Sequence, residues 1–123
     1  MMSSEIGGQM PHELVALVEA ATSHLGDLGR AVTQQARVAR VVGFSSTNVD
    51  ASTPLDVPKV ALPSGPTPGR AFVHSESELA SEVMVWSRAG RFIGLEQPWY
   101  TDEPPTTWPL PEQIRALRGG AEW

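Results

Sequence analysis

The N-terminal third of the chain carries a helical repeat of apolar positions. Five steps over 18 positions give an average spacing of 3.6 for the set Leu14, Val18, Ala21, Leu25, Leu28 and Val32. This is the spacing of one buried stripe on an amphipathic helix. Gly26 and Gly29 interrupt the stripe, and glycine costs up to about 1 kcal/mol relative to alanine inside a helix. The pattern predicts an N-terminal amphipathic helix that ends before about residue 37, with a kink or a break into two helices near the glycines.

Two segments of strand character follow, and a long connector comes after them. The run RVARVVGF, residues 37–44, is dense in β-branched residues and leads into a polar turn, which predicts a strand and then a second strand at residues 48–52. Five prolines lie between Thr53 and Gly69. Because proline lacks an amide donor, residues 53–69 are predicted to be an extended connector, in which LDV and KVAL are the segments able to pair at a sheet edge. Residues 64–77 are expected to make few ladder hydrogen bonds.

Residues 81–100, SEVMVWSRAGRFIGLEQPWY, carry the strongest local pattern. A two-residue turn at Ala89–Gly90 would pair residues 81–87 with residues 92–97 in an antiparallel hairpin. This register places four apolar side chains on one core-facing side, namely Met84, Trp86, Ile93 and Leu95. A bulged three-residue turn is the alternative, and it would shift the register.

The C-terminal segment is rich in proline up to Pro111, which excludes regular structure before that residue. Pro111 and Glu112 suit the first turn of a helix and Gly119 suits its end, so a short C-terminal helix is predicted. The whole pattern predicts an α+β fold: an antiparallel sheet of about four strands, the N-terminal helix on one face and the short helix at one end. Residues 1–10 and 119–123 are predicted to be flexible termini of a single domain, residues 11–118.

Composition narrows the classes of function. The 123 residues suit one core, and the absence of cysteine excludes disulfides, thiol chemistry and cysteine-based zinc sites. No segment resembles a cleaved signal or a membrane span, so a cytoplasmic protein without a membrane partner is expected. Fourteen acidic against nine basic residues give a net charge of −5, with the bases scattered singly. Nucleic acid is therefore not an expected partner, whereas a basic protein is electrostatically allowed.

No catalytic motif is present, and an enzyme is not expected. His12, His24 and His74 lie far apart outside any metal-binding spacing, and the chain lacks a GxSxG elbow, a P-loop and a dinucleotide fingerprint. A carboxylate dyad of Glu96 with Asp102 or Glu103 would need a substrate cleft between the two groups, and no second cleft-forming segment is evident. We therefore assign no catalytic, cofactor-binding or metal-binding residues.

An aromatic and acidic cluster after the hairpin is the candidate recognition surface. Aromatic residues beside charge are enriched in binding hot spots, so the predicted partner-binding residues are Trp99, Tyr100, Asp102 and Glu103. The alternative is that Trp99 and Trp108 fold back and close the core beneath the proline-rich tail. Of the two, Trp108 is predicted to be structural.

The segment from about residue 40 to residue 114 resembles a group of small uncharacterised actinobacterial proteins. The shared pattern is a Val-Val-Gly strand, a Val-Asp segment, a Pro-rich connector, a hairpin with Val-Trp, Gly and Leu-Glu, an aromatic-Asp-Glu-Pro-Pro tail and a Pro-flanked helix. The matching residues are Val41, Val42, Gly43, Val49, Asp50, Val85, Trp86, Gly90, Leu95, Glu96, Trp99, Tyr100, Asp102, Glu103, Pro104, Pro105, Trp108, Pro109 and Pro111. Many members carry clustered cysteines after the first strand, where this chain has Phe44, Ser45 and Ser46. The resemblance implies a fold and brings no established activity, cofactor or metal.

The resulting hypothesis is a non-catalytic protein-binding module, with an immunity-like or antitoxin-like role as its sharpest form. The alternatives are a structural or assembly subunit of phage type that forms homo-oligomers, and a small-molecule-binding domain that uses Glu96, Asp102 and His74.

Overall fold

The computed structural model describes residues 6–75 and 78–117, which form an α+β fold with two helices and two antiparallel sheets. Helices α1 (His12–Ala21) and α2 (Asp27–Val38) come first, joined by a 3₁₀ turn at Ser23–Leu25. The five-stranded sheet has the order β1-β2-β7-β6-β3, formed by β1 (Arg40–Phe44), β2 (Asn48–Ser52), β7 (Arg91–Glu96), β6 (Met84–Arg88) and β3 (Gly65–Pro66). The three-stranded sheet has the order β5-β4-β8, formed by β5 (Glu78–Glu82), β4 (Arg70–Ser75) and β8 (Ile114–Leu117). None of the helices in the described ranges is long and apolar enough to cross a membrane.

The predicted N-terminal helix is broken in two at the glycines. Gly26 has a φ of 60°, a conformation that favours glycine, and it separates the 3₁₀ turn from α2. A side chain at Gly29 would place its Cβ 2.2 Å from the carbonyl oxygen of Thr22, so glycine is needed where the two helices approach. The helix was predicted to end before about residue 37, and α2 ends at Val38, two residues after the fully buried Ala36.

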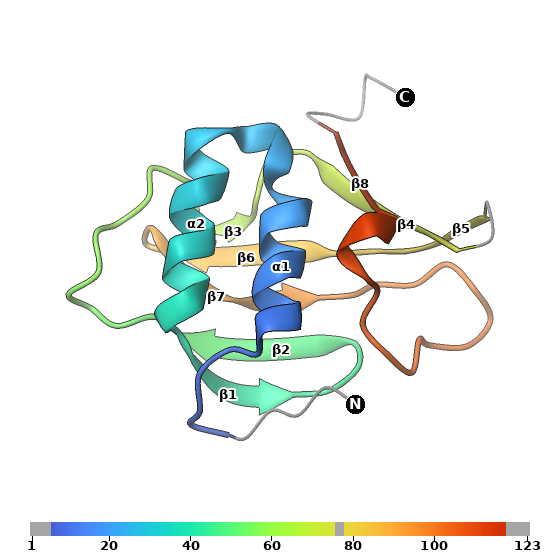
Figure 1. Ribbon diagram of the computed structural model, residues 1–123, viewed down its shortest axis with the longest axis horizontal. Coiled ribbons are helices and arrows are strands. Elements are labelled where there is room, and N and C mark those ends of the chain that lie inside the picture. The colour runs from blue at the N-terminus through green and yellow to red at the C-terminus, as the bar shows by residue number, and fades with distance from the viewer. Residues whose placement is uncertain (1–5, 76–77, 118–123) are drawn as a thin grey trace.

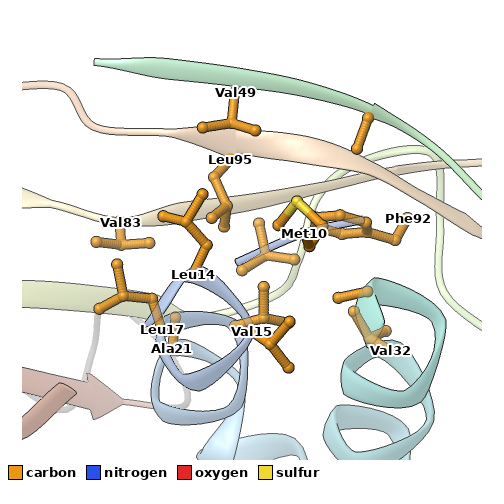
Figure 2. Packing of buried hydrophobic residues seen from close by; sticks show 14 of the residues in the cluster. Met10, Leu14, Val15, Leu17, Ala21, Val32, Val49, Val83, Phe92 and Leu95 are labelled. Carbon is orange, nitrogen blue, oxygen red and sulfur yellow. The ribbon is translucent and has the colours of Figure 1, made fainter. Parts of the chain in front are cut away.

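Both helices lie across one face of the five-stranded sheet (Figure 1). Their buried side chains meet those of the sheet in a single core (Figure 2), which includes Leu14, Leu17 and Val18 of α1, Val32 and Ala36 of α2, and Val41, Val49, Val85, Phe92 and Leu95 of the sheet. No helix among the described residues lies on the opposite face of this sheet. The prediction of a second strand at residues 48–52 is confirmed by β2.

The hairpin has the predicted two-residue turn but a different register. Ala89 and Gly90 both have positive φ, 51° and 79°, and Arg88 pairs with Arg91. Beyond Ser87 the pairing shifts by one residue, so that Trp86 lies opposite Gly94 rather than Ile93. Ile93 is the extra residue of a β-bulge, which lets Phe92 and Leu95 both enter the core although three positions separate them.

Because of the bulge, the side of the hairpin that faces the core differs from the predicted side. Met84, Trp86 and Ile93 are half-buried on the face without helices, whereas Leu95 is buried as predicted. The core side of the hairpin is instead formed by Val83, Val85 and Phe92 together with Leu95.

The sequence missed the three-stranded sheet. Its central strand β4 lies within the segment expected to make few ladder bonds, and the predicted C-terminal helix is a 3₁₀ turn at Pro111–Gln113 followed by β8. Strand pairing with β4 satisfies more backbone groups over Ile114–Leu117 than a single helical turn could. LDV and KVAL form no strand; the connector contributes only the two-residue β3. These elements explain why the described residues hold eight strands rather than about four.

One bent hairpin belongs to both sheets. The ladder between β4 and β5 continues into the five-stranded sheet through hydrogen bonds from Val83 N to Ala71 O and from Thr67 N to Val85 O, each 2.8 Å long. Residues 7–9, within the predicted flexible N-terminus, run beside β1, where Val41 N donates to Gly8 O over 2.8 Å. Residues 1–5 and 118–123 lie outside the described residues.

We predict that Gly94→Ala destabilises the protein far more than Gly65→Ala. Both glycines have positive φ, 153° and 119°, so both substitutions introduce backbone strain of about 1–3 kcal/mol. Only at Gly94 would the new Cβ also collide with backbone, 2.1 Å from the carbonyl oxygen of Val49, whereas Gly65 has no atom within 4 Å. Thermal unfolding of the two variants measures the difference. Equal melting temperatures would contradict the close approach of β2 and β7.

Candidate binding surface

The face of the five-stranded sheet that carries no helix has a hollow at its centre. Cross-strand pairs form a row from Gly43 through Asp50 and Gly94 to Trp86, across strands β1, β2, β7 and β6. Because Asp50 has glycine on both sides, no neighbouring side chain in this row fills the space next to its carboxylate. The result is a hollow of about 270 Å³, lined by side chains of Asn48, Asp50, Trp86, Ile93 and Glu96 over the backbone of Gly94.

Two carboxylates and an indole define the chemistry of this hollow. Glu96 accepts a hydrogen bond from Trp86 Nε1 at 3.1 Å, and Asp50 accepts one from Asn48 Nδ2 at 3.0 Å. Neither carboxylate forms an ion pair with any residue of the described ranges. Two uncompensated negative charges beside an aromatic ring favour a cation, through Coulomb attraction and cation–π contact.

A second hollow of about 300 Å³ continues from the first toward Trp99. It shares Asn48 and Glu96 with the first hollow and is further lined by Thr47, Gln97, Pro98 and Trp99. Trp99 is 43% exposed, and its backbone forms a β-bridge with Ser81 of β5. We refer to the two hollows together, lined by Asn48, Asp50, Trp86, Ile93, Glu96 and Trp99, as the sheet-face site.

The structure separates the four residues predicted to bind a partner. Trp99 lines the sheet-face site, whereas the hydroxyl of the next residue, Tyr100, donates to Glu82 on the three-stranded sheet. Asp102 and Glu103 are exposed in the following loop and line neither of the two hollows. Their role in binding stays a prediction.

The two tryptophans of the tail have different environments. Trp108 is 7% exposed and donates from Nε1 to Ser45 O over 2.8 Å, so it closes the core as predicted. Trp99 does not join it there. The sequence did not indicate Asp50 as a binding residue, and Trp86 was assigned to the core. Gly94, which breaks the apolar alternation of β7, was the signal that could have revealed the bulge and therefore the exposed side of Trp86.

The other candidate chemistry does not assemble. Glu96 lines the sheet-face site, whereas His74 lines a groove on the other sheet, so the two line different hollows. Within residues 6–75 and 78–117, no three His, Cys, Asp or Glu side chains are grouped closely enough to hold a metal ion.

Comparison of the chain with protein-family models, with curated proteins and with solved structures finds no match. The resemblance to small actinobacterial proteins therefore stays a prediction from the sequence.

We predict that Trp108→Ala lowers the free energy of unfolding by about 3–5 kcal/mol, because it leaves a cavity and an unpaired carbonyl at Ser45. Trp99→Ala is the matched control and should cost far less, since that side chain is 43% exposed. The pair Asp102→Lys, Glu103→Lys should change stability by only about 0.5 kcal/mol. Chemical denaturation measures all three. A Trp99 variant as unstable as the Trp108 variant would show that both rings support the core.

Proposed function

We propose that this protein is a non-catalytic protein-binding module whose sheet-face site receives a basic segment of a partner. The observation that carries the proposal is the pair Asp50 and Glu96, which have no cationic partner in the described chain and surround a hollow walled by the indole of Trp86. An arginine or lysine head group placed there would contact both the ring face and the carboxylates.

The arrangement of the site supports an extended segment as its occupant. Two adjoining hollows follow the sheet surface and share Asn48 and Glu96, so neighbouring side chains of one extended strand can enter both. The hydrogen bond between Trp86 and Glu96 fixes the indole before binding, which reduces the entropy lost on association. The net charge of −5 would accelerate encounter with a basic partner.

An immunity-like role is the form of this function in which the basic partner is a toxin. The acidic, aromatic sheet face supports it, and inhibition of such a partner's activity by this protein would test it.

The assembly-subunit alternative places a second copy on the same face. In that case the indole signal of Trp86 would depend on protein concentration without any added partner.

The binding chemistry can be tested with acetyl-Gly-Arg-Gly-Arg-Gly-amide as a probe. We predict that this peptide shifts the indole N–H resonance of Trp86 in a saturable manner, and that the matching peptide with neutral citrulline in place of arginine does not. Trp99→Phe, Trp108→Phe and Trp123→Phe variants identify the other three indole signals of the chain. Equal shifts from both peptides would show that the charge of the arginines plays no part in binding.

A matched pair of double variants locates the site. Asp50→Asn with Glu96→Gln should weaken binding of the arginine peptide about tenfold, because it removes the charges that face the cation. Asp102→Asn with Glu103→Gln removes the same charge from the neighbouring loop and should leave affinity within about twofold if long-range attraction alone is lost. If only the loop pair weakens binding, the recognition surface is the tail and the sheet-face proposal is wrong.

A further inference from the structure

The outer face of the three-stranded sheet carries a groove of about 560 Å³ that the sheet-face site does not include. Ala71 and Val73 of β4 are buried in the core, so the alternate residues of this strand face outward. The groove is lined by these outward residues and their neighbours on the adjoining segments: Arg70, Phe72 and His74 of β4, Leu79 of β5, Arg115 of β8, and Tyr100.

A buried carboxylate holds one end of this groove rigid. Glu82, whose side chain is 10% exposed, accepts two hydrogen bonds from Arg70, from Nε at 2.9 Å and from Nη2 at 2.6 Å. The hydroxyl of Tyr100 donates to the same carboxylate, which fixes the tyrosine ring. The Arg70 guanidinium lies 4.7 Å from the centroid of the Phe72 ring. The hydrogen bonds that Arg70 donates to Glu82 raise the pKa of Arg70, so this guanidinium stays charged at the edge of the groove.

The charge of the groove is opposite to that of the whole chain. Arg70 is compensated by Glu82, but Arg115 is exposed and forms no ion pair with the residues that the structure describes. Arg115 lies directly opposite Phe72 across the β4–β8 ladder, and both residues line the groove, so a cation borders its apolar surface. Leu79, 43% exposed, and Tyr100, 48% exposed, form the rest of that surface. An apolar floor bordered by arginine favours a ligand in which an apolar group is next to a carboxylate.

We infer that this groove is a second docking site, for a segment of a partner protein that carries acidic residues beside aliphatic or aromatic ones. Its occupant is a peptide segment because the groove is open along the sheet, unlike a small-molecule site that encloses most of its ligand. The complementarity lies in the uncompensated Arg115 and the exposed Leu79 and Tyr100 on the same outer face. The site differs in position and in charge from the sheet-face site, so either one can fail without the other.

The probe for this inference is acetyl-Ser-Glu-Leu-Phe-Glu-Ser-amide, followed by chemical shifts of backbone amides. We expect saturable shifts in β4, β8 and Tyr100, and at least fivefold weaker binding for two altered peptides. One has glutamine in place of glutamate, and the other has serine in place of leucine and phenylalanine.

Variants of exposed residues separate groove binding from general attraction. Arg115→Gln should weaken binding of the acidic peptide at least fivefold, and Leu79→Ser should do the same. The matched controls are Arg88→Gln, exposed on the other sheet, and Leu55→Ser, 81% exposed in the connector, and both should stay within twofold of the parent. The inference would be overturned if Arg88→Gln and Arg115→Gln weakened binding equally, or if the glutamine peptide bound as tightly as the acidic peptide. It would also be overturned by shifts confined to the sheet-face site, or by the lack of a saturable shift at the solubility limit of the peptide.

Discussion

The relative placement of both sheets and the tail depends on the hydrogen bonds of one buried side-chain amide, that of Gln97. It accepts a hydrogen bond from Ser81 Oγ of β5 at 3.0 Å, and it donates to Ser46 O in the turn between β1 and β2 at 2.9 Å and to Thr107 O beside Trp108 at 3.3 Å. Only 2% of the residue is exposed. Because an unpaired polar group at such a site costs about 1–3 kcal/mol, the segments bonded to it cannot shift independently. The end of β7 is thereby fixed against the second sheet.

This anchoring explains how one short segment contributes to two surfaces of opposite charge. Beyond Gln97 the chain pairs with β5 through Glu82 N to Pro98 O and Tyr100 N to Ala80 O, each 3.0 Å long. Successive side chains of an extended segment point in opposite directions. Trp99 therefore reaches the acidic sheet-face site, and Tyr100 reaches the groove that Arg115 borders. The aromatic pair that looked like one cluster in the sequence is divided between two places by the alternation of the backbone.

Features decided by local chemistry could be predicted from the sequence, and features decided by distant pairing could not. The helix break at Gly26, strand β2 and the turn at Ala89–Gly90 follow from neighbouring residues. The bulge at Ile93 depends on which side chains the helices cover, and β4 depends on partners on both sides, one of them near the C-terminus. For the same reason the sequence could not place the acidic and aromatic residues of the proposed sheet-face site next to one another. Asp50 becomes part of a site only when two glycines from other strands lie beside it.

The bulge in β7 also constrains how the chain can change in length over evolution. Because Ile93 is the extra residue, its loss would restore a regular alternation in which Phe92 and Leu95 still point inward and Glu96 still points outward. A deletion elsewhere in β7, outside residues 93–94, would exchange the inward and outward sides of the residues on one side of it. The connector at residues 53–64 forms no strand, and it can gain or lose residues at a cost that rises slowly with loop length. Length variation among homologous chains should accordingly accumulate in the connector, and within β7 it should be confined to the bulge.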